Sequence, residues 1–113
     1  MTNKLTCRKN KTSEATLEKR LVTKITDLGG IAWKFTSPGT IGVPDRIIMF
    51  QGKLCFVEMK APGKQMREIQ KWRKEQIERE GFPVMCLSSE EQVDEFVEEL
   101  IRNGIQTTSV SRN

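Results

Sequence analysis

The chain has 113 residues, enough for one compact domain, with 30% charged residues and a net charge of +4. This mildly basic balance favours a polyanionic partner, and no apolar run approaches the ~20 residues that a bilayer span needs. The sequence contains no histidine, so the commonest general base and the commonest zinc ligand are both absent. Any catalysis must therefore use carboxylates, lysine or cysteine.

The three cysteines, Cys7, Cys55 and Cys86, are widely separated and form no CxxC pair. Their spacing disfavours both a zinc site and a disulfide framework. The N-terminal residues are basic and lack the apolar segment of a signal peptide. Together these features predict a reduced, cytoplasmic setting.

Composition divides the chain into three regions. Residues 1–12 are polar and predict a basic arm, residues 13–103 carry the apolar pattern of one folded domain, and residues 104–113 predict a polar tail. At the start of the domain, Ser13 is a candidate helix N-cap, and the helix should stop at Gly29-Gly30. Apolar residues at helical spacing lie between these signals: Leu17, Leu21, Ile25 and Leu28.

Three predicted strands follow the first helix. β-branched and aromatic residues predict strands over residues 31–35 and 45–50, with a turn-rich loop between them. A tight turn at residues 51–53 leads into a third strand over residues 54–60. The second and third strands should therefore form an antiparallel hairpin.

The remaining elements alternate between helix and strand. The apolar spacing predicts a helix over residues 64–80 and a short buried strand over residues 83–87. Ser88 and Glu91 match a capping box that opens a last amphipathic helix. Because a strand–helix–strand crossover is right-handed, the fourth strand should run parallel to the third. The prediction is an α/β fold of order αβββαβα, with helices flanking a mixed central sheet.

The predicted hairpin brings three reactive side chains to one end of the sheet. Asp45 opens the second strand, while Glu58 and Lys60 close the third strand on one face. Antiparallel pairing places Asp45 beside both. If the first helix packs at this end, Glu14 and Glu18 join the group, because both lie on its inward side.

Clustered carboxylates repel one another unless a cation neutralises them. Oxygen ligands suit Mg²⁺ or Mn²⁺, which retain water molecules that can be activated for hydrolysis. Lys60 could orient the attacking water or stabilise charge on a phosphate. The residues therefore predict metal-assisted phosphodiester hydrolysis.

A purely structural interpretation competes with this one. An aspartate after proline is commonly a turn residue, and Glu-x-Lys on a strand is commonly part of a solvated face. The apolar run before Glu58, Leu-Cys-Phe-Val, argues instead for a buried strand. The combination at hairpin distance is more specific than either part alone.

The residues also resemble a known nuclease family. The order Glu, Pro-Asp and Glu-x-Lys on this layout looks like the PD-(D/E)XK nuclease superfamily, and within it like the VRR-NUC (virus-type replication-repair nuclease) family. The resemblance covers about residues 13–102. The segments concerned are SEATLE at 13–18, FTSPGTIGVPDRI at 35–47, FVEMKAPGK at 56–64, Gln70, and GFPV at 81–84.

The resemblance implies a restriction-endonuclease-like fold and roles for particular residues. Asp45 and Glu58 would bind metal together with the carbonyl of Met59. Lys60 would assist the nucleophile. Gln70 resembles the family's helix glutamine near the scissile phosphate, and the alternative is an exposed helix former.

A glutamate of the first helix would complete the resembled site. Glu14 matches the acidic residue of the broader family, whereas Glu18 matches the glutamate of similar Holliday-junction resolvases. Both remain candidates, for catalysis and, in the case of Glu18, as a metal ligand.

Basic residues around the site suit contacts with DNA phosphates, which give salt-dependent and sequence-tolerant affinity. Each of them could equally belong to a solvated surface. The candidates are Lys34, Arg46, Lys64, Arg67, Lys71 and Lys74. No recognition helix is apparent, so branched DNA such as four-way junctions or flaps is the expected substrate. The resemblance to resolvases further implies a C2 homodimer and a phage or prophage origin.

Three other functions compete with this prediction. They are a nicking or restriction-like nuclease on duplex DNA, a catalytically silent DNA-binding module on the same fold, and a structural domain. The intact Asp45, Glu58 and Lys60 argue against a silent module, which does not need all three.

Overall fold

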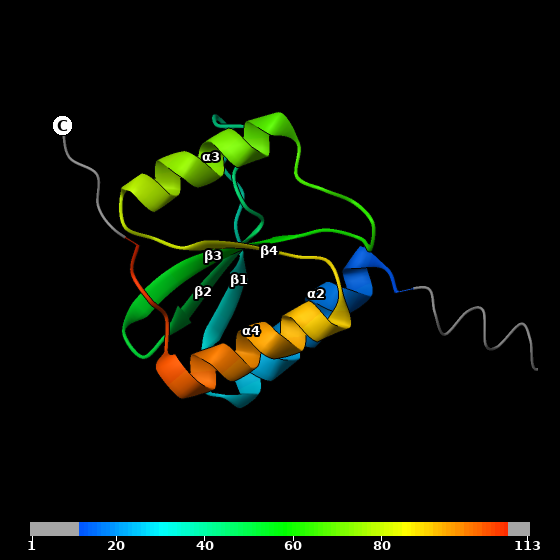
Figure 1. Ribbon diagram of the computed structural model, residues 1–113, viewed down its shortest axis with the longest axis vertical. Helices are drawn as coiled ribbons and strands as arrows, with labels where there is room; N and C mark the ends of the chain where they lie inside the picture. The colour runs from blue at the N-terminus through cyan, green and yellow to red at the C-terminus, as the bar shows by residue number, and fades with distance from the viewer. Residues whose placement is uncertain (1–11, 109–113) are drawn as a thin grey trace, which may run out of the picture.

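The computed structural model describes residues 12–108, in which a β-sheet lies between two layers of helices (Figure 1). Helix α3 (Glu68–Arg79) lies on one side of the sheet, and α2 (Glu14–Asp27) and α4 (Glu90–Asn103) lie side by side on the other. The strands are β1 (Ile31–Lys34), β2 (Arg46–Phe50), β3 (Lys53–Met59) and β4 (Val84–Leu87). The predicted α/β class and the element order are confirmed.

The sheet has the strand order β1-β2-β3-β4. Strands β1, β2 and β3 pair antiparallel, and β4 runs parallel to β3, as the crossover rule predicts. Gln51 and Gly52, with φ of 53° and 78°, form the two-residue turn between β2 and β3. This turn sets the register that pairs Arg46 with Val57 and leaves Asp45 next to the end of β3.

The apolar stripe of α2 faces the sheet. Leu17, Leu21 and Ile25 are fully buried and belong to the same core cluster as Ile48 and Val57. The hydroxyl of Ser13 accepts a hydrogen bond from the Thr16 backbone N–H at 3.1 Å, which caps the helix where the sequence predicts. Burial of this stripe sets which face of α2 points at the strands, and so where its glutamates lie.

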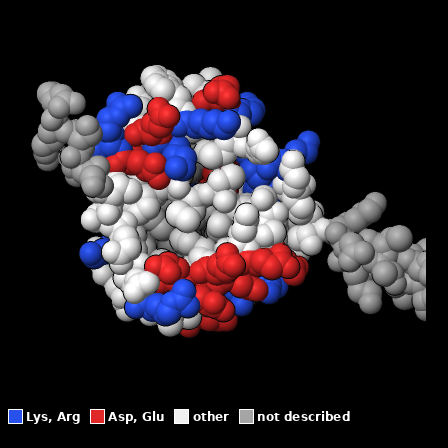
Figure 2. All heavy atoms as spheres, in the orientation of Figure 1, with Lys and Arg blue, Asp and Glu red and all other residues white. Residues whose placement is uncertain are grey.

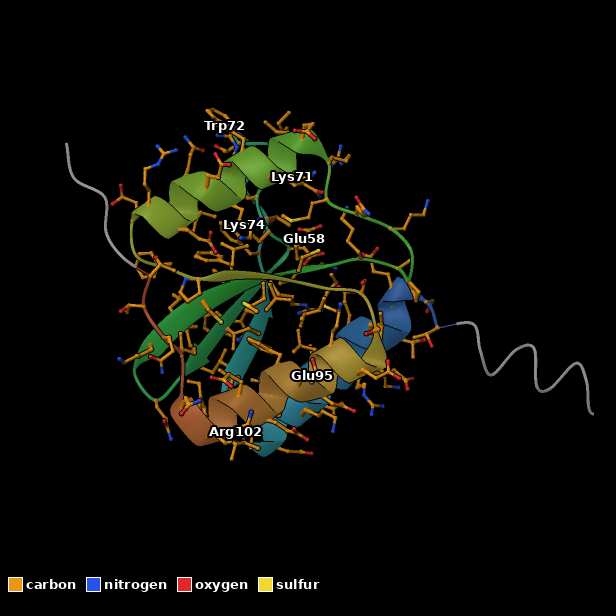
Figure 3. The ribbon with its side chains drawn as sticks, in the orientation of Figure 1. Glu58, Lys71, Trp72, Lys74, Glu95 and Arg102 are labelled. Carbon is orange, nitrogen blue, oxygen red and sulfur yellow. The ribbon has the colours of Figure 1, made fainter. Side chains whose placement is uncertain are left out.

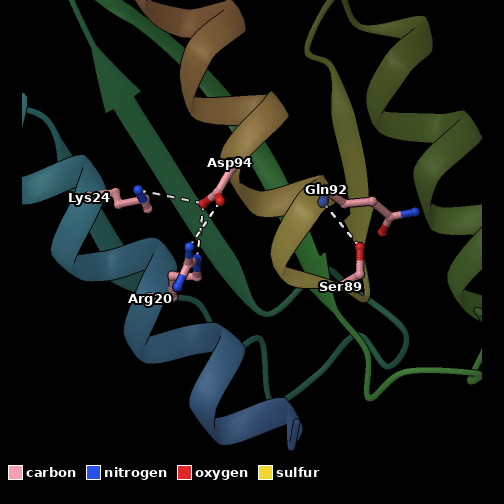
Figure 4. A network of polar contacts seen from close by, with 5 residues as sticks. All are labelled: Arg20, Lys24, Ser89, Gln92 and Asp94. Atoms are coloured by element: carbon pink, nitrogen blue, oxygen red, sulfur yellow. Dashed lines mark hydrogen bonds and ion pairs between the residues drawn. The ribbon is translucent and has the colours of Figure 1, made fainter. Parts of the chain in front are cut away.

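Helix α4 begins one residue later than the sequence predicts. Its N-cap is Ser89, whose hydroxyl accepts from the Gln92 backbone N–H at 3.1 Å (Figure 4). Ser88 instead donates its backbone N–H to the side chain of Gln92 at 2.7 Å. The predicted pair of Ser88 and Glu91 is therefore wrong. Two adjacent serines fit the same motif, and the extended backbone of Ser89 selects the second one.

Helix α3 also begins later than predicted, at Glu68 instead of residue 64. A turn at Pro62 and Gly63, with φ of 85° at Gly63, delays it. The first turn of the helix is capped by Gln70, whose side-chain oxygen accepts from the Arg67 backbone N–H at 2.8 Å.

Residues 104–108, predicted as part of a polar tail, lie against the domain. Ile105 is 3% exposed and belongs to the core cluster, and the Thr108 backbone N–H donates to the carbonyl of Gly81 at 3.0 Å. The rest of the predicted tail, residues 109–113, and residues 1–11 of the predicted arm are outside the described residues.

Cys55 and Cys86 are both free cysteines in this fold. Between residues 12 and 108, no helix is long and apolar enough to cross a bilayer.

Candidate active site at the end of β2 and β3

Asp45 is tied to the neighbouring strand by its side chain. Its Oδ1 accepts a hydrogen bond from the Met59 backbone N–H at 3.2 Å, and its carbonyl accepts from the Phe35 N–H at 2.8 Å. Pro44, which precedes it, is fully buried. The aspartate is therefore fixed at the end of the hairpin, between the last residues of β3 and the loop from β1.

The loop that leads to Asp45 packs closely against helix α3. Gly42 has a φ of 85°, and a Cβ at this position would lie 2.7 Å from Cγ1 of Ile69. Arg73 donates its Nε–H to the Ile41 carbonyl at 2.8 Å and so holds the same loop. Only glycine meets both the backbone and the packing requirement at position 42.

Three carboxylates gather at this end of the sheet. Oxygen atoms of Glu14, Glu18 and Asp45 all lie within 4.8 Å of one another. The two glutamates are one helical turn apart on α2, so they project together toward Asp45. The structure thus places both helix glutamates beside the aspartate, and we call this group the carboxylate cluster.

Helix α2 is also held in place by α4, its neighbour in the same layer. Arg20 forms a two-bond fork with Asp94 of α4, with both N–O distances 2.9 Å, and Lys24 lies 3.5 Å from the same carboxylate (Figure 4). The guanidinium lowers the pKa of Asp94 below its usual value, chiefly through this hydrogen bond. The ion pair therefore joins α2 to α4 within their layer.

Glu58 lies in the layer between the sheet and α3 (Figure 3). It is only 5% exposed, and its Oε2 accepts from the Gln70 side-chain amide at 3.0 Å. The Lys60 Nζ lies 3.6 Å from the same oxygen. The structure therefore brings Glu58, Lys60 and Gln70 together, with Asp45 joined to them through the backbone of Met59.

Burial raises the pKa of both central carboxyls. The pKa of Asp45 rises to about 6, mainly by desolvation and further by the charges of Glu18 and Glu14, while the Met59 N–H lowers it. The pKa of Glu58 rises to about 7, again mainly by desolvation and then by Asp45, while Lys60 lowers it. Both carboxyls therefore lose their protons at a higher pH than usual, and a nearby cation would favour their ionised forms.

The donor set of the carboxylate cluster fits a hard divalent cation. It offers carboxylate oxygens, which Mg²⁺ and Mn²⁺ prefer, and no thiol or imidazole among its members. Burial, and then the charges of Glu18 and Glu14, raise the pKa of Asp45, so a cation bound there would favour its ionised form. The residues present therefore fit such a metal.

The basic residues predicted to contact DNA fall into two groups. Lys34, Lys64 and Arg67 are exposed and make no ion pair within residues 12–108. Lys71 and Lys74 of α3 pair with acidic residues of their own helix, at 3.5 Å from Glu68 and 3.1 Å from Glu78. The exposed pair of Lys71 with Glu68 is weak, so Lys71 can exchange partners, whereas the pair of Lys74 with Glu78 is half-buried.

Arg46 differs from the other basic residues because its side chain turns inward. Its Nε lies 3.8 Å from Glu18 Oε2, and its side chain is 15% exposed. The basic character of this residue predicts a DNA contact and gives no sign of the contact with Glu18. The signal was available in the alternation of β2, since Arg46 and the buried Ile48 must lie on one face of the strand.

Comparison with known proteins identifies the class of this domain. No family model matches the chain. Its sequence is 42% identical over 79 residues to p44, named as a nuclease, of Acyrthosiphon pisum secondary endosymbiont phage 1; the match covers 69% of this chain and 85% of p44. A solved structure described as a VRR_NUC domain matches the fold with a TM-score of 0.71 and 28% identity, over 77% of this chain and 96% of that one.

The fold, the acidic strand end and these similarities define an α/β nuclease domain. More specifically, the chain belongs to the VRR-NUC family of nucleases, which confirms the family that the sequence pattern predicted.

Proposed function

We propose that this nuclease is a Mg²⁺- or Mn²⁺-dependent DNA endonuclease that hydrolyses phosphodiester bonds, with branched DNA as its substrate. The observation that supports it most is the carboxylate cluster, in which oxygens of Glu14, Glu18 and Asp45 lie within 4.8 Å of one another. Such a group is costly without a cation and offers the ligands that these metals prefer.

In this proposal the metal is held where β2, β3 and α2 meet. Asp45 and Glu58 are ligands together with the Met59 carbonyl, and Glu14 or Glu18 adds a carboxylate from the helix. A bound Mg²⁺ or Mn²⁺ supplies a Lewis acid and a water of lowered pKa. The hydrogen bond from the Met59 N–H to Asp45 orients that carboxylate before any ligand arrives.

Lys60 is the candidate for handling the nucleophile. Its Nζ lies 3.6 Å from Glu58 and its side chain is 16% exposed, so the charge is held beside the site instead of in bulk water. A fixed ammonium there can orient the attacking water or stabilise negative charge on the phosphate.

For Gln70 the contacts support a different role from the one that the resemblance implies. Its amide nitrogen donates to Glu58 and its oxygen accepts from Arg67, so both ends are in use. At 6% exposed, it is buried beside Glu58. We therefore propose that Gln70 orients Glu58 and does not itself bind the scissile phosphate.

The charge distribution supports approach of DNA from the end of the sheet and from α3. Acidic side chains form a band along α4, whereas α3 carries both signs (Figure 2). Phosphates would be repelled by α4. The proposed contacts are the exposed Lys34, Lys64 and Arg67, with Lys71 and Lys74 of α3. They bind the backbone without reading bases, which suits recognition by DNA shape.

We also propose a homodimer, which would present two sites to a branched substrate. Strand β1 is an edge of the sheet and exposes Trp33 to 62% and Ile31 to 38%. An aromatic side chain of this kind on an open edge suits a protein contact. A solution mass equal to one chain, both alone and with DNA, would contradict the dimer.

The test of the proposed substrate is a cleavage panel. Labelled four-way junction, flap and linear duplex are incubated with the chain in Mg²⁺, in Mn²⁺ and in EDTA. Cleavage of the branched substrates in the presence of metal supports the proposal. Preferential cutting or nicking of linear duplex would favour the restriction-like alternative, and binding without cleavage in either metal would favour the silent module.

A further inference from the structure

Arg46 is the first residue of β2, and its guanidinium lies between the sheet and α2. Its Nη1 donates to the carbonyl of Ala32 at 3.4 Å, and its Nε lies 3.8 Å from Glu18 Oε2. The Nε is buried and makes no hydrogen bond with any residue from 12 to 108. A buried cation with incomplete hydrogen bonding is costly, so a strong negative environment must stabilise it.

The carboxylate cluster provides that environment. Glu18 belongs to the cluster with Glu14 and Asp45, and the pair with Arg46 is the one ion pair to these three carboxylates in the described part of the chain. The cluster therefore contains one resident positive charge, at the side facing the sheet. Glu14 lies at the exposed side, away from any ion pair in residues 12–108.

Arginine suits this position better than lysine would. The planar guanidinium presents several donors in a fork, which lets it contact the Ala32 carbonyl and Glu18 at the same time. Lysine carries a single ammonium on a flexible stem. The guanidinium thus links Glu18 to the backbone of the neighbouring strand β1.

We propose that Arg46 is a positioning residue that acts as the resident counter-cation of the carboxylate cluster and limits its affinity for the metal. It holds Glu18 toward Asp45 in the metal-free protein. It also keeps a positive charge beside the ligands, which opposes a second cation. Glu14 then remains the freely available helix ligand, and Glu18 is shared between Arg46 and the metal. The inference rests on the proposed metal site.

The test measures Mn²⁺ binding by calorimetry at pH 8, together with thermal unfolding of the metal-free protein. Arg46→Gln removes the charge, so Mn²⁺ should bind about tenfold more tightly, the order expected for partly screened charges close together. The metal-free variant should melt at a lower temperature, because Glu18 loses its partner. Arg46→Lys keeps the charge, so its Mn²⁺ affinity should stay within about threefold of that of the unsubstituted chain.

Arg20→Gln is the matched control. It removes a guanidinium that also anchors α2, through Asp94, but lies outside the cluster. It should lower the melting temperature and leave Mn²⁺ affinity unchanged. Unchanged or weaker Mn²⁺ binding by Arg46→Gln, with normal binding by the unsubstituted chain, would overturn the inference and leave the proposed function standing. No Mn²⁺ binding by the unsubstituted chain would overturn both.

A measurement on the unsubstituted chain covers the case in which Arg46→Gln does not fold. In an NMR titration with Mg²⁺, the Nε–H signal of Arg46 should move and saturate together with metal binding, because Glu18 is drawn away from the guanidinium. The Nε–H signal of Arg20 should stay in place. An unmoved Arg46 signal at saturating Mg²⁺ would contradict the inference.

Discussion

Asp45 and Met59 are joined by a hydrogen bond of 3.2 Å from the backbone N–H of Met59 to Oδ1 of the aspartate. This bond crosses the end of the hairpin and fixes Asp45 against the segment that holds Glu58 and Lys60. It connects the carboxylate cluster of Asp45 and the two α2 glutamates to the strand end that carries the buried Glu58, so these acidic groups lie at the same end of the hairpin.

The loop before Asp45 should not tolerate a side chain at position 42. Gly42→Ala faces a positive φ and a contact of 2.7 Å with Ile69, whereas Gly63→Ala faces a similar φ with no atom within 4 Å. Both changes should destabilise the fold by about 1 kcal/mol through the backbone. Gly42→Ala should cost about 1–3 kcal/mol more through overpacking. Denaturant unfolding measures both, and equal losses would show that the loop can relax.

Glu14 and Glu18 should contribute unequally to metal binding. Glu14→Gln removes a carboxylate that is free of ion pairs in the described residues and should weaken Mn²⁺ binding on the order of tenfold. Glu18→Gln removes a carboxylate that is already shared with Arg46, so this change should weaken Mn²⁺ binding less than Glu14→Gln does. Parallel calorimetric titrations decide the order, and a larger loss in Glu18→Gln would assign the helix ligand to that residue.

Metal-free stability should fall as pH rises from about 4 to 7. Burial raises the folded pKa of Asp45 to about 6 and that of Glu58 to about 7, above their ordinary values near 4. In this window the folded state binds more protons than the unfolded state, so the free energy of unfolding decreases with pH.

Metal binding should have the opposite pH dependence, because the ligands must lose those protons. Mn²⁺ affinity should rise through pH 6–7 and then level off. Thermal melts with and without Mn²⁺ across this range measure both effects. Metal-free stability that stays flat between pH 4 and 7 would show that the two carboxyls keep their ordinary pKa values in the folded state.

Gln70 should contribute to the free energy of unfolding, because it bonds both to the buried Glu58 and to the start of α3. Gln70→Ala leaves the buried Glu58 without its amide donor and leaves the Arg67 N–H without its acceptor, at a cost of about 1–3 kcal/mol. Gln76, which lies on the same helix and bonds to Arg73, offers a control on the less buried part of α3. Gln76→Ala should cost well under half as much in a chemical denaturation series.

Much of this fold follows from local patterns. Helical spacing of Leu17, Leu21 and Ile25 predicts which side of α2 is buried, and the two-residue turn predicts the hairpin register. The hairpin register pairs Arg46 with Val57 and so places Asp45 beside the end of β3. The gathering of site residues was therefore predictable from the sequence.

Other features depend on contacts that periodicity does not encode. Ile105 follows Gly104 in a polar segment that has no apolar pattern. Its burial becomes evident only from the structure, where the chain after the end of α4 packs against the domain. The basic character of Arg46 predicts a contact with DNA phosphates, whereas its position on β2 turns the side chain toward Glu18 of α2. Whether Ser88 or Ser89 caps α4 depends on which of them has an extended backbone. Because the two neighbouring residues are identical, the sequence does not distinguish them.

The measurement that tests the central claim most directly compares the unsubstituted chain with Asp45→Asn on a labelled four-way junction in Mg²⁺ at pH 8. Because the asparagine keeps the size of the side chain but loses its charge, cleavage should fall at least about a hundredfold while junction binding stays within a few-fold. Full cleavage by Asp45→Asn, or cleavage by the unsubstituted chain in EDTA, would contradict a metal-dependent site at the end of this hairpin.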